Sequence, residues 1–219
     1  MKIYNFKEYF RTLTPNYLLF LIKKNLPENC LTLLDLGCGD GSQVQFLPRT
    51  IKCTGVEAHA PSLKISKNNN IHNNYVAIDV RNIQSVFKPK SFDCVLAIDL
   101  IEHLTKREAL VLLQQMEIIA SKIIMLQTPS GFLTQHEYKG NQLQKHKCGF
   151  THTELQSLGY TVYGMHGPKF LRINKDGTIR ILNVPLALIA NVLDLFMRKL
   201  PKYCFNMFAY KKIQGKNAD

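Results

Sequence analysis

LLDLGCGDGS, at residues 33–42, is a short apolar run that leads directly into three glycines. The apolar part predicts a buried strand, and a helical pattern follows the glycines. In an open parallel sheet, ligands bind beyond the carboxyl ends of the strands, where glycines let the backbone approach a ligand without a Cβ clash. Gly37, Gly39 and Gly41 therefore predict a binding turn. Its spacing is G-x-G-x-G, in place of the G-x-G-x-x-G of dinucleotide sites.

Strand-like and helix-like segments alternate on both sides of this turn. Thr105 and Glu108 form a capping box before apolar residues at helical spacing, and Thr151 and Glu154 form a second one. The alternation predicts an α/β fold with a Rossmann-like, doubly wound, mostly parallel sheet and helices on both faces. The seven predicted strands lie at residues 31–38, 51–58, 75–79, 91–99, 122–129, 160–165 and 203–212.

The length of 219 residues suits one domain with decorations. We expect a single domain over 1–219, with its core at 30–165 and an N-terminal helix within 6–26. The decorations are a substrate-side loop at 130–150 and an insert at 166–200.

The insert contains the apolar stretch ILNVPLALIANVLDLF, at residues 181–196. It is too short, and too interrupted by Pro185 and Asp194, for a transmembrane helix. Two interpretations remain, namely a helix that caps the core, or an interfacial helix that contacts a membrane or a lipid-linked substrate.

Acidic residues end the next two predicted strands. Glu57 stands 20 residues beyond Gly37, where a carboxylate can accept hydrogen bonds from both hydroxyls of a ribose. Asp79 ends the third strand, beside the same pocket, and can accept a hydrogen bond from an adenine amino group. Together with the glycine spacing, Asp79 weakens the interpretation as an NAD-dependent dehydrogenase.

These blocks, taken with FDCVLAIDLIEHL at residues 92–104, resemble the class I S-adenosylmethionine-dependent methyltransferases, and most closely their type 11 small-molecule subgroup. The resemblance covers about residues 30–165 and implies S-adenosyl-L-methionine as the cofactor and a seven-stranded sheet whose last strand is antiparallel. It implies that Asp35 and the glycine turn hold the methionine part and that Glu57 holds the ribose. The other implied cofactor contacts are Asp79 and Val80 at the adenine and Asp99 in the cavity.

Asp99, Glu102 and His103 lie between the fourth strand and the capping box, at the mouth of the expected crevice. Methyl transfer from a sulfonium is an in-line displacement, and a hydroxyl acceptor benefits from a general base. His103 is the candidate base, with Asp99 as a second catalytic candidate and Glu102 on the substrate side. The alternatives are that His103 only braces the loop, or that Asp99, Glu102 and His103 bind a divalent ion. Such a set is similar to the E-x-x-E-H of ubiquinone-type O-methyltransferases, and its oxygen ligands favour Mg²⁺.

The loop at 130–150 carries three further candidates for substrate contact, which are His136, Tyr138 and His146. In related sequences this stretch lies beside the substrate opening, so each of them is expected to face either the acceptor or solvent.

The net charge is +12, and residues 139–219 hold most of the excess, with 13 Lys or Arg against 4 Asp or Glu. A basic half can bind nucleic acid or an anionic membrane, but these charges form no dense block and also suit a solvated surface. No N-P-P-[YF] motif follows the fourth strand, which argues against methylation of base amino groups. We therefore expect no strong binding of nucleic acid.

Six cysteines occur without any C-x-x-C pair, so the sequence indicates neither a zinc site nor a thioredoxin-like site. Cysteines in this pattern indicate a protein of a reducing compartment. The N-terminal residues MKIYNFKEYF lack the apolar segment of a signal peptide. These features predict a cytoplasmic protein, with peripheral membrane contact through 181–200 as the alternative.

The leading functional prediction is a methyltransferase that acts on a small-molecule acceptor, on oxygen, such as a glycan sugar, a quinone-like phenol or a natural-product intermediate. An RNA methyltransferase and a catalytically inactive cofactor-binding protein are the alternatives.

Overall fold

The computed structural model describes residues 17–137, 141–172, 193 and 196–213. Within them lies one seven-stranded sheet with the order β3-β2-β1-β4-β5-β7-β6. Five neighbouring strands are parallel, while β7 pairs antiparallel with both β5 and β6. All seven predicted strands are confirmed, with bounds shifted by a few residues. The strands are β1 (Thr32–Leu36), β2 (Lys52–Val56), β3 (Asn74–Val76), β4 (Phe92–Ile98), β5 (Ala120–Pro129), β6 (Thr161–Pro168) and β7 (Cys204–Lys212).

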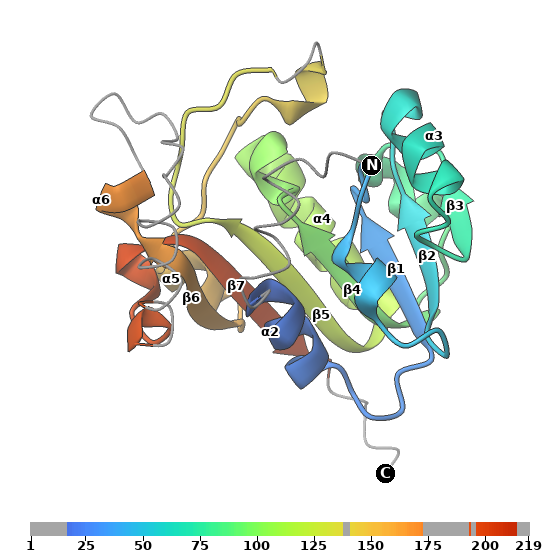
Figure 1. Cartoon of the computed structure of the whole chain (residues 1–219), viewed down its shortest axis with the longest axis horizontal. Helices are drawn as coiled ribbons and strands as arrows, with labels where there is room; N and C mark the ends of the chain where they lie inside the picture. Colours follow the sequence, from blue (N-terminus) through green and yellow to red (C-terminus); the bar gives the residue numbers. More distant parts are fainter. Residues whose placement is uncertain (1–16, 138–140, 173–192, 194–195, 214–219) are drawn as a thin grey trace, which may run out of the picture.

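Helices cover both faces of the sheet, as predicted, because alternate residues of the central strands point to opposite sides. One apolar cluster joins Leu34 and Val95 to α4 (Lys106–Ile119), α5 (His152–Ser157) and the 3₁₀ turn η2 (Val80–Ser85). The other joins Leu33 and Cys94 to α2 (Tyr17–Asn25), which crosses in front of the sheet in Figure 1. Further helical pieces among the described residues include α3 (Ala60–Asn68), α6 (Lys169–Arg172) and η5 (Pro201–Tyr203).

Two helix starts follow the predicted capping boxes. In both, the threonine side chain accepts from the backbone N–H three residues on, and the glutamate reaches back to the threonine N–H. The short helix that is predicted after the glycines is the four-residue 3₁₀ helix η1 (Gln43–Phe46). Pro48 lies just beyond it and prevents its extension. The predicted apolar helix at 181–196 falls almost wholly outside the described residues.

The loop at 130–150 is closed at its base. A parallel bridge joins Ser130 to Phe150, and the Gly131 N–H donates to the Phe150 carbonyl at 2.7 Å. The two ends of the loop pass so closely that a Cβ on Gly149 would lie 2.4 Å from the backbone nitrogen of Phe132. The loop rises above the carboxyl ends of the parallel strands in Figure 1, and η3 (Ile101–His103) and η4 (Gln142–Gln144) lie at the same edge.

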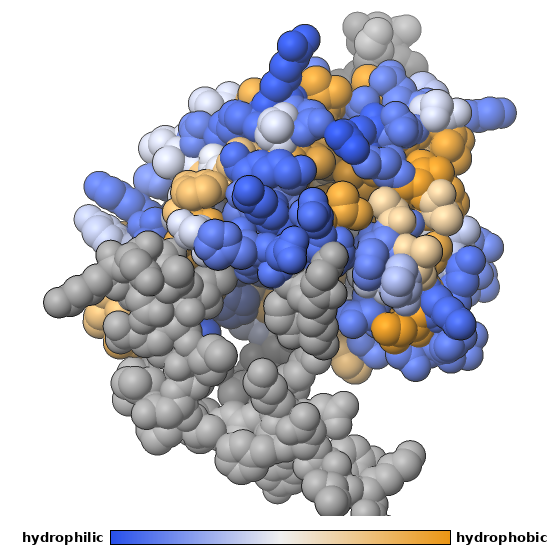
Figure 2. Space-filling view, turned by 90° about the horizontal axis from the view of Figure 1, so that it is seen from above, coloured by the Kyte–Doolittle hydropathy of each residue, from blue (hydrophilic) through white to orange (hydrophobic). Residues whose placement is uncertain are grey.

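Seen from this edge, the described surface is mostly hydrophilic, with scattered hydrophobic patches (Figure 2). No helix among the described residues is long and apolar enough to cross a membrane.

Candidate active site

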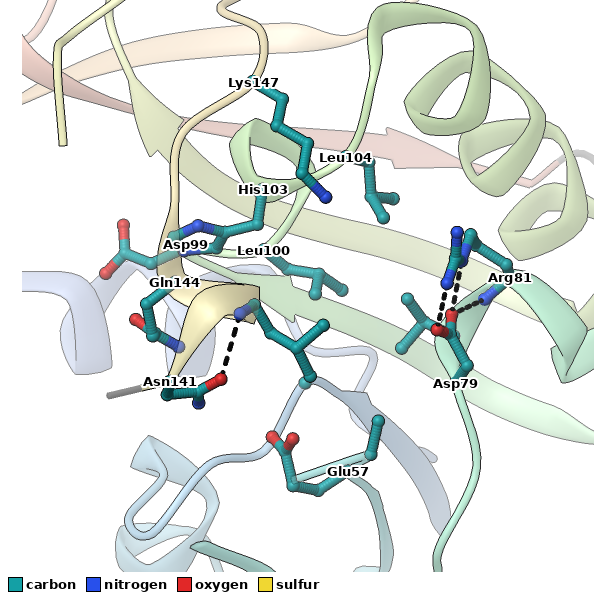
Figure 3. Close-up of a pocket in the computed structure, with 14 residues that line it drawn as sticks. Glu57, Asp79, Arg81, Asp99, Leu100, His103, Leu104, Asn141, Gln144 and Lys147 are labelled. Atoms are coloured by element: carbon teal, nitrogen blue, oxygen red, sulfur yellow. Dashed lines mark hydrogen bonds and ion pairs between the residues drawn. The ribbon is translucent and has the colours of Figure 1, made fainter. Parts of the chain in front are cut away.

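A cavity that is open to solvent at its mouth lies at the carboxyl ends of β1 and β4, from which the chain continues to opposite halves of the sheet. We call it the main cavity (Figure 3). It is lined by Gly37, Glu57, Ala58, Asp79, Val80, Arg81, Asp99, Leu100, His103, Leu104, Asn141, Leu143, Gln144 and Lys147.

The glycine turn forms one wall of the main cavity through Gly37. Gly37 and Gly39 both have left-handed backbone conformations, with φ of +66° and +58°. A Cβ on Gly37 would also lie 2.8 Å from the Leu100 side chain, so the turn fits against the end of β4 only as glycine. Gly41 has open space around it and does not line the cavity.

Glu57 ties the ends of β1 and β2 together. Its two carboxylate oxygens accept hydrogen bonds from the Gly39 N–H at 2.9 Å and the His59 N–H at 2.7 Å. Each oxygen has a second lone pair, and the carboxylate also borders the main cavity. Glu57 is therefore held in place by the backbone and remains able to accept further hydrogen bonds.

Asp79 is held by an arginine that the sequence analysis did not single out. Arg81 donates to both carboxylate oxygens of Asp79 and also to Glu108 at the start of α4. Hydrogen bonds from Arg81 lower the pKa of the Asp79 carboxyl, so it is ionised at neutral pH. Val80 lies next to it in the wall of the main cavity.

Asp99 follows β4 in a left-handed conformation, with φ of +47°, which is uncommon for a residue other than glycine. Its Oδ1 accepts a hydrogen bond from Gln127 Nε2 at 2.9 Å. The side chain borders the main cavity and an adjoining one, so its exposed surface faces the crevice and not the outer surface of the protein. This protein-lined setting raises the pKa of Asp99 to about 6.

Most residues that line the adjoining cavity are polar, and we call it the second cavity. It shares Asp99, His103 and Gln144 with the main cavity. Its other lining residues are Glu102, Pro129, Gln135, His146, Phe205 and Asn206. Asn206 Oδ1 is buried and has no hydrogen-bond partner among the described residues. A ligand group in the second cavity would lie directly beside a ligand in the main cavity.

Glu102, His103 and His146 are all buried and meet between these cavities. The ring centroids of the two histidines are 4.9 Å apart. Burial, together with the neighbouring His146, lowers the pKa of His103 to about 4, and burial also lowers the pKa of His146. Both imidazoles are therefore neutral at pH 7. Burial and the nearby Asp99 raise the pKa of the Glu102 carboxyl well above its ordinary value.

Besides Gly39 and Gly41, three further predicted site residues line neither cavity or lie outside the described residues. Asp35 is buried in β1, where its Oδ2 lies 2.8 Å from His72 Nε2, so any effect on a ligand is indirect. His136 is exposed and lines neither cavity. Tyr138 lies outside the described residues.

Several lining residues were missed by the sequence analysis. Asn141, Gln144 and Lys147 come from the loop at 130–150, and no motif distinguishes them from ordinary solvated loop residues. Arg81 could have been suspected, because it follows Asp79 by two residues, in the first turn of the helix that Asp79 caps.

This sheet order, with a glycine turn after β1 and acidic residues after β2 and β4 around one cavity, defines the fold of the class I methyltransferases. Residues 34–116 match the family model described as a methyltransferase domain, of type 11. The chain carries the type 11 methyltransferase domain over this segment, and the resemblance inferred from the sequence is confirmed there.

Solved structures with the same fold are similar over almost the whole chain. A methyltransferase from Archaeoglobus fulgidus described as SAM-dependent is 16% identical, with a TM-score of 0.56, over 95% of this chain and all of that one. Magnesium protoporphyrin IX methyltransferase from Synechocystis PCC 6803, with bound SAM, is 15% identical, with a TM-score of 0.51, over 96% of this chain and 86% of that one. The plantazolicin methyltransferase BpumL, in complex with SAH, is 18% identical, with a TM-score of 0.54, over 94% of this chain and 84% of that one. No curated protein sequence matches the chain.

Proposed function

We propose that the chain binds S-adenosyl-L-methionine in the main cavity and transfers the methyl group to an oxygen atom of a small-molecule acceptor. The observation that carries the proposal is Glu57, a carboxylate that is fixed at the end of β2 against the glycine turn, beside the switch point between β1 and β4. Ligands of doubly wound sheets bind at this point, and an acidic residue there recognises ribose hydroxyls. Asp79 and Val80 line the same cavity on the side expected for adenine. The neighbours solved with SAM or SAH support this choice of cofactor.

The second cavity is the proposed acceptor site, because it joins the main cavity at Asp99 and His103. The acceptor oxygen attacks the methyl carbon, the bond from carbon to sulfur breaks, and S-adenosylhomocysteine leaves. The hydroxyl proton must be taken up as the new carbon–oxygen bond forms. Alignment of the two reactants by the cavity walls supplies much of the rate enhancement.

Asp99 suits the role of proton acceptor better than His103. A general base is most effective when its pKa is near the working pH, and the pKa of Asp99 is raised to about 6 while that of His103 is lowered to about 4. Both residues border both cavities, but His103 is buried, whereas Asp99 is exposed to the crevice. We therefore assign the base to Asp99 and keep His103 for a supporting role.

The acceptor is proposed to be small and polar, because hydrophilic side chains such as Gln135, Gln144 and Asn206 line the second cavity. A cytoplasmic location and peripheral membrane contact through residues 181–200 stay predictions, as does the expectation that nucleic acid is not the acceptor.

Calorimetry and a methyl-transfer assay test the proposal. We expect the protein to bind S-adenosylmethionine and S-adenosylhomocysteine much more tightly than NAD. Incubation with methyl-labelled cofactor and panels of sugars, phenols and carboxylic acids should then label a hydroxyl compound. Tighter binding of NAD would refute the cofactor assignment. Labelling confined to carboxylates or amines would refute methylation of a hydroxyl oxygen.

A further inference from the structure

Asn206 is a polar residue in a part of β7 that is otherwise apolar. The other residues of the segment 204–209 are apolar and buried, and Asn206 itself is only 6% exposed. Asparagine is depleted in strands, and a buried carboxamide normally has hydrogen-bond partners. The Oδ1 atom of Asn206 has none among the described residues. Packing alone therefore gives no reason for this side chain, and a leucine, which has the same branched shape, would suit the strand better.

The second cavity lies against this side chain. Asn206 and Asp99 both line it; Asp99 directly follows β4, and β5 lies between β4 and β7 in the sheet. Neighbouring strands lie about 4.8 Å apart, so the backbones of β4 and β7 are about 10 Å apart. Two short side chains bridge only part of this span. A molecule in the second cavity can therefore contact Asp99 with one group and Asn206 with another.

A second amide lies on the same face of the sheet, but it has a different task. Asn206 pairs with Pro129, and Gln127 stands two residues before Pro129, so both amide side chains point to one face. Gln127 donates to Asp99 Oδ1 at 2.9 Å and lines neither cavity. Gln127 thus holds Asp99 in position, and Asn206 is the amide that borders a molecule in the second cavity.

The charged residues around the second cavity argue against an anionic acceptor. No lysine or arginine is among the described residues that line it, whereas Asp99 and Glu102 are. A carboxylate or phosphate on the acceptor would find two acidic neighbours and no cation, and burial of an unpaired charge is costly. The second cavity therefore favours an acceptor without negative charge.

The chemistry of a carboxamide matches that of a hydroxyl group, because both can donate and accept a hydrogen bond. A simple phenol or an alcohol with one hydroxyl leaves Asn206 unpaired when that hydroxyl lies at Asp99. A buried polar group without a partner is costly, so such acceptors bind less well. An acceptor with a second hydroxyl satisfies both residues at once.

We propose that Asn206 determines acceptor specificity by binding a second hydroxyl group, so that the acceptor is an uncharged polyol such as a sugar ring. The first hydroxyl is the one that is methylated beside Asp99, and in this respect the inference rests on the proposed methyl transfer. The second hydroxyl only forms hydrogen bonds and leaves unmodified. Of the three acceptor classes considered from the sequence, this selects the sugar.

Binding of paired probes tests the inference without turnover. The full-length protein, with and without S-adenosylhomocysteine, is titrated with methyl glucoside, methyl galactoside and methyl mannoside and with their monodeoxy counterparts. Phenol and cyclohexylamine serve for comparison. Calorimetry should show binding of at least one glycoside, and loss of the hydroxyl that Asn206 binds should weaken it by about tenfold. Phenol and cyclohexylamine should bind more weakly than that glycoside.

The variant Asn206→Leu removes the carboxamide and keeps the branched shape of the side chain. It should bind the glycoside and the deoxy counterpart equally weakly. Without ligands its melting temperature should rise by about 2 °C or more, because an apolar group replaces a buried polar group that has no partner. Asn29→Leu, at an exposed asparagine, is the matched control and should distinguish the two probes as the wild type does.

Four results would overturn the inference. They are no binding of any glycoside, binding of phenol or cyclohexylamine at least as tight, unchanged discrimination in Asn206→Leu, and a lower melting temperature of that variant, which would mean that Asn206 supports the fold. Selective binding of a glycoside without any methyl transfer to it would refute the proposed function and leave the binding role of Asn206 intact.

Discussion

At the residue scale, Glu57 has two tasks that an affinity measurement can separate. Its carboxylate braces the turn through the Gly39 and His59 N–H groups, and it is proposed to accept the ribose hydroxyls. Hydrogen bonds to a charged group contribute about 1.5–3 kcal/mol each. Glu57→Ala should therefore weaken binding of S-adenosylhomocysteine by roughly 10- to 100-fold or more.

An analogue without the ribose 2′-hydroxyl separates the two tasks. It should bind the wild type more weakly than S-adenosylhomocysteine does, while the Glu57→Ala variant should distinguish the two compounds much less. Glu28→Ala, an exposed carboxylate in another loop, serves as the control and should behave like the wild type. Equal discrimination by both proteins would mean that Glu57 only braces the turn.

Asp99 gives a prediction about the pH dependence of the reaction. Its pKa is raised to about 6, and a general base works only when it is deprotonated. Turnover should therefore fall as the pH drops through about 6. Asp99→Asn should reduce turnover by about 10²–10⁴-fold with cofactor affinity nearly unchanged, since asparagine tolerates the left-handed backbone. A variant with normal turnover and an unchanged pH profile would contradict the assignment.

Only some of the site residues and their partners could be predicted from the sequence. Gly37, Glu57 and Asp99 could be identified because each directly follows a strand, and Asp79 because it lies three residues beyond one, where the fold dictates their positions. The pairing of Asp35 with His72 could not, because it joins residues 37 positions apart and neither belongs to a motif that names the other. For the same reason His146 was assigned to substrate contact and not to a cluster with Glu102.

At the element scale, residues at the start of α4 fix the position of Asp79 in the wall of the main cavity. Thr105 and Glu108 form the capping box, and Arg81 links Glu108 to Asp79. Loss of an N-cap hydroxyl costs about 0.5–2 kcal/mol. Thr105→Ala should lower the free energy of unfolding by about this amount, measured by urea denaturation. Thr153→Ala, which leaves both capping boxes in place, should change it much less.

The same cap makes the protein sensitive to acid. Hydrogen bonds from Thr105 and Arg81 lower the pKa of Glu108 from its ordinary 4.5 to about 2. A carboxyl with a lowered pKa stabilises the fold above its unfolded pKa and loses that contribution as the pH falls. The melting temperature should thus drop between pH 4.5 and 2, and Glu108→Gln should flatten this drop. Parallel curves for variant and wild type would show that the cap does not titrate as expected.

Capping boxes were predictable because they are local, with the partners three residues apart. The sequence predicted a short helix after the glycines but not its type, and the structure has the 3₁₀ helix η1 there, with Val44 buried in the core.

At the scale of the whole molecule, the net charge of +12 is the feature that favours RNA as an alternative acceptor. Binding through phosphate contacts weakens steeply as the salt concentration rises. On a plot of log K against log salt concentration, each phosphate contact to a duplex contributes a slope of about −0.9. We expect only weak binding of RNA and no methyl transfer to it at physiological salt. A filter-binding series from low to high salt measures this, and tight, strongly salt-dependent binding together with labelled RNA would favour the alternative.

The closed base of the loop at 130–150 has a consequence for how this protein can diversify. The Ser130–Phe150 bridge and the tight crossing at Gly149 isolate the loop from the sheet, so its interior can change in length and composition without moving β5. Gln135, Gln144 and His146 lie on this loop and face the second cavity, whereas Glu57, Asp79 and Asp99 lie on the sheet side. Changes inside the loop can thus alter acceptor preference while Glu57, Asp79 and Asp99 keep their places, although Asn141, Gln144 and Lys147 of the same loop also line the main cavity.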